Sequence, residues 1–294
     1  MKRKNILWML CVVLMLIASV ATAQESWDDI LMKMDAANTK EALAQSTGRA
    51  AYRVNFVYNG GLSYAVRNYF DQEKYVYEED GYIEIDVGGK VAGCFAEEET
   101  YFSQCFVGEE AYAEMQRYRA SAWYQYEPIE KVVQVTEENG KLMIETEMTK
   151  DALLRQFEAN YGYEANDVKR ISMHYVVDAQ TYEIDQFGGT AEKADGSTCI
   201  FIDMHREHGV EEYVIPEKIA EILNGEDTRN LTLIENPETD QEITYTYQVP
   251  SGVMCQIILS SDYEQVLYED AAFTKEWEGS ADYTKDLTAY IKKI

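Results

Sequence analysis

The chain has 294 residues, with 53 acidic and 26 basic side chains, which gives a formal net charge of −27 at pH 7. A charge of this size repels nucleic acid and anionic membrane surfaces, so neither is expected as a partner. Hydrophobic residues make up 46% of the chain and the acids are dispersed, which favours a folded protein with a sizeable core over disorder.

The N-terminus has the three parts of a secretory signal peptide. Basic residues occupy positions 2–4, an apolar run follows from Ile6 to about Val20, and Ala21-Thr22-Ala23 supplies small residues at a cleavage point. A retained anchor helix is the alternative, but the apolar run is short for a bilayer, which needs about 20 residues. We predict that residues 1–23 are removed, that the mature chain has no transmembrane segment, and that the protein is extracellular or in the cell envelope.

The mature chain is expected to begin with a helix. Ser26 and Asp29 form a capping box, and apolar residues recur at helical spacing from Ile30 until Gly48. The period then changes to the two-residue alternation of strands, with turn signals at Asn59-Gly60-Gly61 and Asn139-Gly140. Strands are predicted near 52–58, 62–70, 83–87, 92–107 (a hairpin), 131–136, 142–148, 171–177, 182–187 and 198–204.

Three further segments contain helix signals. Residues 109–122 are ambiguous, Thr149 caps a predicted helix that finishes near Gly162, and Pro216 opens a predicted helix through Leu223. The polar stretch 224–228 is a plausible linker, which gives a main domain of residues 24–224 and a small module of residues 229–294. Strands in this module are predicted at 231–234, 243–249, 253–259 and 287–291, and its small size predicts packing on the larger domain.

Four cysteines remain after removal of the signal peptide: Cys94, Cys105, Cys199 and Cys255. Export permits disulfides, and a hairpin turning at Glu99-Thr100 would place Cys94 directly opposite Cys105. The alternative is that all four are free and act as small hydrophobic side chains in the core. Both interpretations stay open at this point.

No constellation of residues predicts catalysis. His205 and His208 form an H-x-x-H pair, but the alternation before them indicates a strand, on which residues three apart point to opposite faces. The sequence also lacks a G-x-S-x-G elbow, a glycine-rich phosphate loop and an EF-hand calcium loop. We therefore predict a protein that is not an enzyme, with no catalytic residues, no cofactor and no metal site; a zinc hydrolase built on the two histidines is a distant alternative.

Residues 26–223 resemble the lipoprotein-carrier superfamily. The segments that carry the resemblance are KYVY (74–77), GYIE (81–84), ENGKL (138–142) and YVVDAQTYEI (175–184). The resemblance implies an α+β fold in which a curved, incompletely closed antiparallel sheet wraps around a few helices and holds acyl chains on its concave face. The sequence departs from this pattern because it lacks an acceptable lipid-attachment cysteine.

The C-terminal module is similar to the internalin-type β-grasp repeat in the segments LTLI (231–234), QVPSG (248–252) and DLTAY (286–290). Such repeats act as spacers or adhesive modules, and their presence implies an envelope or secreted protein of a Gram-positive-like bacterium. The fold class predicted for the whole chain is therefore α+β, a curved open sheet followed by a small β-rich module.

The expected function is the binding of an apolar, lipid-like ligand or an envelope component. In a curved sheet the apolar sides of the strands converge inward and would line a cavity. Those positions are Val54, Phe56, Ile83, Ile85, Leu142, Ile144, Met173 and Tyr175. The alternative is a structural or adhesive surface protein in which its own side chains fill that space. The sequence makes no prediction of oligomeric state.

Overall fold

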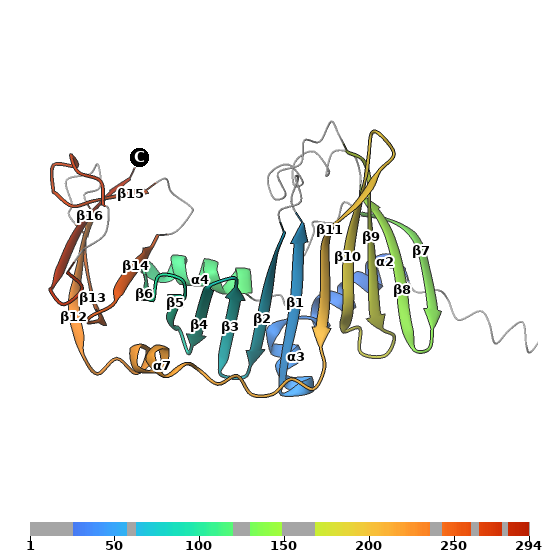
Figure 1. Ribbon diagram of the computed structural model, residues 1–294, viewed down its shortest axis with the longest axis horizontal. Coiled ribbons are helices and arrows are strands. Elements are labelled where there is room, and N and C mark those ends of the chain that lie inside the picture. Colours follow the sequence, from blue (N-terminus) through green and yellow to red (C-terminus); the bar gives the residue numbers. More distant parts are fainter. Residues whose placement is uncertain are drawn as a thin grey trace, which may run out of the picture.

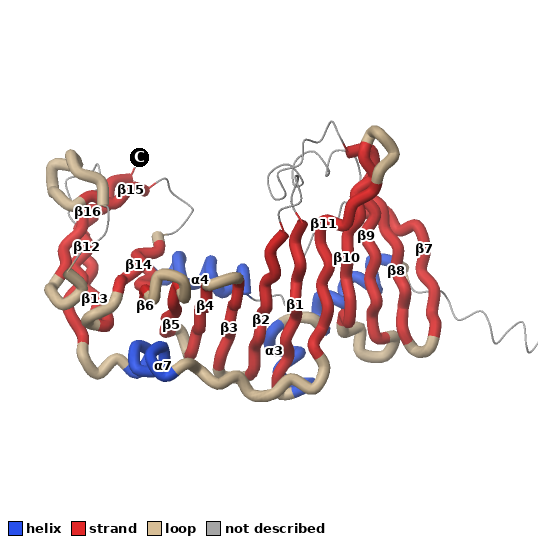
Figure 2. Tube along the Cα trace, in the orientation of Figure 1, coloured by secondary structure: helices blue, strands red, loops and turns tan. Residues whose placement is uncertain are grey.

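The computed structural model describes residues 26–57, 63–119, 130–148, 168–235, 243–259, 265–277 and 282–293. The predicted signal peptide, the turn at 59–61 and the predicted helix at 149–162 lie outside these residues. Within them, four helices accompany two β-sheets, in agreement with the predicted α+β class (Figures 1 and 2). The helices are α2 (Trp27–Ala37), α3 (Lys40–Thr47), α4 (Gly108–Arg119) and α7 (Glu217–Asn224).

The larger sheet has twelve strands, is curved and does not close into a barrel. Its spatial order is β14-β6-β5-β4-β3-β2-β1-β11-β10-β9-β8-β7, and neighbours are antiparallel except for β14 and β6. The strands are β1 (Arg49–Val57), β2 (Ser63–Asp71), β3 (Lys74–Glu79), β4 (Tyr82–Val87), β5 (Lys90–Phe95), β6 (Thr100–Phe106), β7 (Glu130–Glu138), β8 (Lys141–Met148), β9 (Val168–Asp178), β10 (Ile184–Lys193), β11 (Thr198–Glu207) and β14 (Met254–Ile258).

The smaller sheet has four strands in the order β13-β12-β16-β15. It consists of β12 (Thr228–Glu235), β13 (Ile243–Pro250), β15 (Gln265–Tyr268) and β16 (Leu287–Lys293). The sequence places β14 among these strands, but the structure pairs it with β6 of the larger sheet. The C-terminal residues therefore contribute to both sheets, and the predicted domain boundary at 224–228 stays a prediction.

The N-terminal helical region is broken where the sequence predicts one helix. Ser26 caps α2 by accepting a hydrogen bond from the backbone N–H of Asp29 at 3.2 Å, as the capping box predicts. A second N-cap follows at Thr39, whose hydroxyl accepts from the backbone N–H of Ala42. Because this cap starts a new helix, α2 ends at Ala37 and α3 runs from Lys40 to Thr47.

The turn at Asn139-Gly140 confirms the strongest local prediction. Both residues have positive φ, at 53° and 74°, as a two-residue type I′ hairpin requires. Asparagine and glycine tolerate this conformation better than other residues, so the turn fixes the register of β7 on β8. The strands and the C-terminal helix predicted between residues 171 and 223 are likewise present as β9, β10, β11 and α7.

The register divides side chains between two faces, because directly paired residues point to the same side of a sheet. Val54 of β1 pairs with Val66 of β2 on one side and with Met204 of β11 on the other. These residues pack with Ile30 and Met34 of α2, so we call their side of the larger sheet the α2–α3 face.

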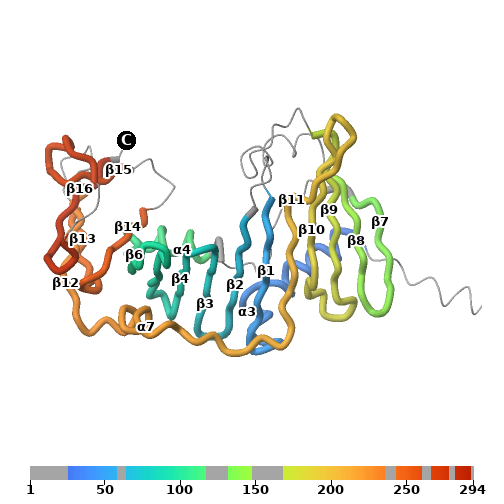
Figure 3. Tube along the Cα trace, viewed as in Figure 1, coloured from blue at the N-terminus to red at the C-terminus, as the bar shows by residue number. Residues whose placement is uncertain are grey.

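The opposite side is the α7 face. Ala51, Ile85 and Ala92 pack there with Ile219 and Ile222 of α7. After β11 the chain runs along one edge of the sheet to reach α7, as Figure 3 shows, and then enters the smaller sheet. Among the residues that the structure describes, no helix combines the length and the apolar character needed to cross a membrane.

Candidate ligand-binding site

Six of the eight residues predicted to line a cavity lie on the α2–α3 face: Val54, Phe56, Leu142, Ile144, Met173 and Tyr175. The other two, Ile83 and Ile85, lie on the α7 face. The reason is the register of strands β1 to β4. Val54 pairs with Val66, Val66 with Glu79, and Glu79 with Tyr82, so the residue of β4 on the same face as Val54 is Tyr82 and not its neighbour Ile83. Alternation within a strand shows which of its residues point to the same side. It does not show which of the two sets lies on the same face of the sheet as a given set on the next strand. The prediction of one common face was therefore wrong for these two isoleucines.

The space above the six residues is occupied by the N-terminal helices. Met34 of α2 and Leu43 of α3 are fully buried, and Ile30 is nearly so. The ring of Trp27 lies 6.5 Å from that of Tyr175, which stacks at 5.2 Å on Phe187. This part of the sheet interior is a packed core made by the protein itself.

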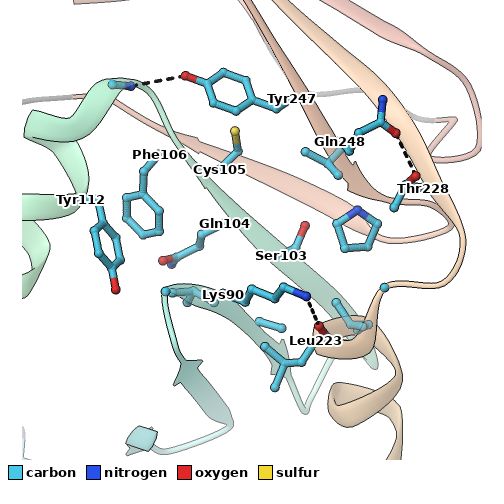
Figure 4. Close-up of a pocket in the computed structure, with 18 of the residues that line it drawn as sticks. Lys90, Ser103, Gln104, Cys105, Phe106, Tyr112, Leu223, Thr228, Tyr247 and Gln248 are labelled. Carbon is cyan, nitrogen blue, oxygen red and sulfur yellow. Dashed lines mark hydrogen bonds between the residues drawn. The ribbon is translucent and has the colours of Figure 1, made fainter. Parts of the chain in front are cut away.

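A cavity lies elsewhere, at the junction of the two sheets (Figure 4). Its volume is about 800 Å³. The lining comes from the adjoining ends of β5 and β6, the first turn of α4, the last turn of α7, and β12 and β13 of the smaller sheet. Most of the lining is apolar, and the volume is in the range of pockets that hold small molecules, roughly 300–1,000 Å³.

The floor of the cavity is formed by small side chains on the α7 face. Ala92 of β5 pairs directly with Ser103 of β6, and Cys105 follows two residues later on the same side. All three are buried. Because large side chains are absent from these positions, α7 and β13 can stand over β5 and β6 without filling the space between them.

Hydrogen bonds hold the walls in place. Lys90 Nζ donates to the carbonyl oxygen of Leu223 at 3.3 Å, which ties the C-terminal turn of α7 to the start of β5. The backbone N–H of Gly108 donates to the Tyr247 hydroxyl at 3.3 Å, which joins α4 to β13, and burial raises the pKa of that tyrosine. Gly225 ends α7 in the left-handed conformation and turns the chain toward β12.

A single polar atom of the floor distinguishes the cavity from an ordinary apolar void. Ser103 is 4% exposed, and its hydroxyl lies beside the thiol of Cys255 on β14. A hydroxyl that donates to the thiol keeps its lone pairs, with which it can accept a hydrogen bond from a polar group of a bound molecule. Ser103, Ala92 and the whole cavity were not predicted from the sequence, because their neighbours in space come from residues 222–250.

The structure decides between the two interpretations of the cysteines. Cys94 lies opposite Tyr101, since the β5–β6 hairpin turns two residues earlier than expected, and Cys94 and Cys105 are both free thiols. The register contradicts the Cys94–Cys105 disulfide, and the alternative of four free cysteines agrees with the structure. Cys105 instead lies beside Cys255 of β14, and their thiols are hydrogen-bonded.

The strand predicted at the H-x-x-H pair is present as β11. His205 lies on β11, where its Nε2 is 2.8 Å from a carboxylate oxygen of Asp203 on the same side of the strand. His208 lies beyond the end of β11. Over the described residues, no group of three or more His, Cys, Asp and Glu side chains is arranged to hold a metal ion.

Comparisons with known proteins give distant likenesses only. No protein-family model and no curated protein matches the chain. The solved structure of the LolA superfamily protein NE2245 from Nitrosomonas europaea is similar at 7% identity, over 62% of this chain and 96% of its own, with a TM-score of 0.23. GphF dehydratase 1 is similar at 9% identity over 53% of this chain and 74% of its own, with a TM-score of 0.15. Likenesses this distant carry no inference about function, and the resemblance of the tail to the internalin-type repeat stays a prediction.

Proposed function

We propose that this protein binds an apolar, lipid-like ligand in the cavity between the two sheets, outside the cytoplasm and without catalysing a reaction. The observation that carries the proposal is the cavity of about 800 Å³ with its floor of small side chains. The extracytoplasmic location rests on the signal-peptide pattern of residues 1–23. The site differs from the one expected from the sequence, because α2 and α3 occupy that region.

The driving force for such binding is the burial of apolar surface. Each methylene group that moves from water into the cavity contributes about 0.8 kcal/mol, so an acyl chain of moderate length is held without any charge. Ser103 at the floor offers one hydroxyl for a hydroxyl group of the ligand. This combination favours a mostly apolar molecule with a small polar group.

The proposal is tested with the neutral apolar fluorophore N-phenyl-1-naphthylamine as probe. The wild-type protein should bind it saturably, and Ser103→Phe should weaken binding at least tenfold because the ring fills the floor of the cavity. The melting temperature of this variant should stay close to that of the wild type, since no native side chain is displaced.

Ala191→Phe is the matched control. Ala191 is fully buried in the core on the α2–α3 face, far along the sheet from the cavity. There the same enlargement should cost roughly 1–3 kcal/mol of stability and leave probe affinity unchanged. Absence of saturable binding in the wild type, or equal binding by Ser103→Phe, would reject the cavity as a ligand site.

A structural or adhesive surface protein is the second candidate, and the packed core on the α2–α3 face favours it. A protein of this kind needs no ligand, and its cavity would be a by-product of the packing of the smaller sheet. The probe experiment separates the two functions. A wild-type protein that binds neither the fluorophore nor a fatty acid supports the structural role.

A further inference from the structure

Two cysteines from distant parts of the sequence meet where the smaller sheet joins the larger one. β14 pairs in parallel with β6, so that Cys255 lies opposite Ser103 and Ile257 lies opposite Cys105. Cys255 and Cys105 are consequently diagonal neighbours on the same side of two adjacent strands. Both are at least nine-tenths buried, and their thiols are hydrogen-bonded to each other.

The surroundings of Cys255 favour its thiolate form. The hydrogen bond from Cys105 lowers the pKa of Cys255 against the opposing effect of burial, and the guanidinium of Arg229 and the hydroxyl of Ser103 lower it further. The same hydrogen bond, together with burial, raises the pKa of Cys105. Arg229 is itself buried and donates to the carbonyl oxygens of Val253, Asp282 and Lys285, so its position beside β14 is fixed.

An asymmetric pair of this kind has the roles needed for disulfide exchange. The cysteine with the lowered pKa is the better nucleophile, and its partner resolves the mixed disulfide. Cys105 lines the cavity and Cys255 does not, so an oxidant in the cavity approaches the pair from the side of Cys105. The other two cysteines cannot compete, because Cys94 is opposite Tyr101 and Cys199 lies on β11, across five intervening strands from β6.

We propose that Cys105 and Cys255 form a disulfide when the folded protein meets a disulfide-bearing oxidant such as oxidised glutathione. The Cys255 thiolate attacks one sulfur of the oxidant, its S–S bond breaks, and one glutathione leaves as the thiolate. Cys105 then loses its proton and attacks Cys255 Sγ, which releases the second glutathione. Two protein thiols are oxidised to one disulfide, and one glutathione disulfide is reduced to two thiols.

The cross-link would fasten the edge strand β14 to β6 covalently. It would thereby secure the junction at which the smaller sheet packs and the cavity is formed. The inference does not depend on ligand binding, since it rests only on the placement of the two thiols. An oxidising, extracytoplasmic environment would favour the formation of this disulfide.

The test is peptide mapping by mass spectrometry of the full chain. The protein is equilibrated in glutathione buffers of increasing oxidised fraction, alkylated, and digested without reduction. A peptide pair joining Cys105 to Cys255 should appear and disappear on reduction, while Cys94 and Cys199 stay alkylated. Alkylation of Cys105 and Cys255 at the most oxidising ratio, or a linkage of Cys105 to Cys94, would overturn the proposal.

Two variants separate the pair from general oxidation. Cys255→Ser should abolish the cross-link, and the control Cys199→Ser should keep it. The melting temperature of the oxidised wild type should fall when reductant is added, and the same reductant should leave the melting temperature of Cys255→Ser unchanged. An equal response of both proteins to reductant would count against a bond at this position, and the wild-type peptide map decides the matter even where a variant folds poorly.

Discussion

Asn38 Oδ1 accepts a 2.8 Å hydrogen bond from the backbone N–H of Ile184, although 146 positions separate the two residues in the sequence. The amide nitrogen of Asn38 donates to the carbonyl oxygens of Met34 and Tyr182 at 2.7 and 2.9 Å. Asn38 is fully buried, and its side chain therefore connects the end of α2 to the turn that precedes β10.

Asn38→Ala should be among the most destabilising single substitutions on the α2–α3 face. It leaves the buried N–H of Ile184 and the carbonyl of Tyr182 without this partner, and an unsatisfied buried group costs about 1–3 kcal/mol. We expect a loss of roughly 2–4 kcal/mol in urea unfolding. Asn55→Ala, at a half-buried position on β1, is the control and should cost less than about 1 kcal/mol. Equal losses in the two variants would contradict the connecting role of Asn38.

The packed core on the α2–α3 face makes a second prediction, for two methionines of α2. Met34 is fully buried, whereas Met32 is 64% exposed. Met34→Ala should lower the free energy of unfolding by about 2–5 kcal/mol, and Met32→Ala should change it by less than about 0.5 kcal/mol. Thermal and urea unfolding measure both. A small effect of Met34→Ala would mean that α2 does not fill the sheet interior, and would reopen that face as a ligand site.

What could be predicted from the sequence is what local chemistry determines. The turn at Asn139-Gly140 is recoverable because its two residues are selected by their own positive φ. The helix α7 is recoverable from its apolar spacing and from Pro216 before it. The break between α2 and α3 could also have been found, because Thr39, like Ser26, is a residue type that favours the N-cap position.

What could not be predicted depends on pairing between distant residues. The placement of Ile83 and Ile85 on the α7 face follows from three successive registers, and a one-residue change in any of them would reverse it. The pairing of β14 with β6 joins residues roughly 150 positions apart in parallel, and no turn signal marks it. The cavity likewise depends on the placement of β12 and β13 beside β5 and β6, which is why none of its floor residues was predicted.

Asp178 supplies a prediction about pH. Its carboxylate accepts hydrogen bonds from the backbone N–H groups of Thr181 and Gln180 and lies 3.1 Å from Lys141 Nζ. These donors lower the pKa of Asp178 to about 2. A carboxyl group whose pKa is lower in the folded state adds stability above its unfolded pKa of about 3.9, and this contribution is lost as the pH falls through about 2.

Asp178→Asn keeps an oxygen acceptor in the turn but removes the charge. The variant should be less stable than the wild type by about 1 kcal/mol at pH 7, allowing for solvent screening at this partly exposed site. The difference should shrink between about pH 4 and pH 2, because the wild-type carboxyl becomes protonated there. Urea midpoints at a series of pH values measure it. Asp80→Asn in the exposed β3–β4 turn is the control and should change stability less, and a difference for Asp178→Asn that grows on acidification would contradict the argument.

The junction of the two sheets gives the last prediction. The sequence predicts a protease-sensitive boundary at residues 224–228, but the structure links the two sides of that boundary by β14 on β6 and by Val253 in the core beneath α7. A cut there should therefore yield two fragments that separate on a denaturing gel and elute together in native size-exclusion chromatography. The experiment is run in reductant, so that a bridge between Cys105 and Cys255 cannot hold the fragments together.

Two isoleucines supply matched variants for this test. Ile257 of β14 packs against the core between the sheets, whereas Ile243 at the start of β13 is 43% exposed. Ile257→Asp places a charge in that core, which is strongly unfavourable, and should let the nicked fragments elute separately. Ile243→Asp should leave them together, because its side chain already meets water. Separate elution of the nicked wild-type fragments would show that the C-terminal module is independent, and would remove the pairing on which the cavity rests.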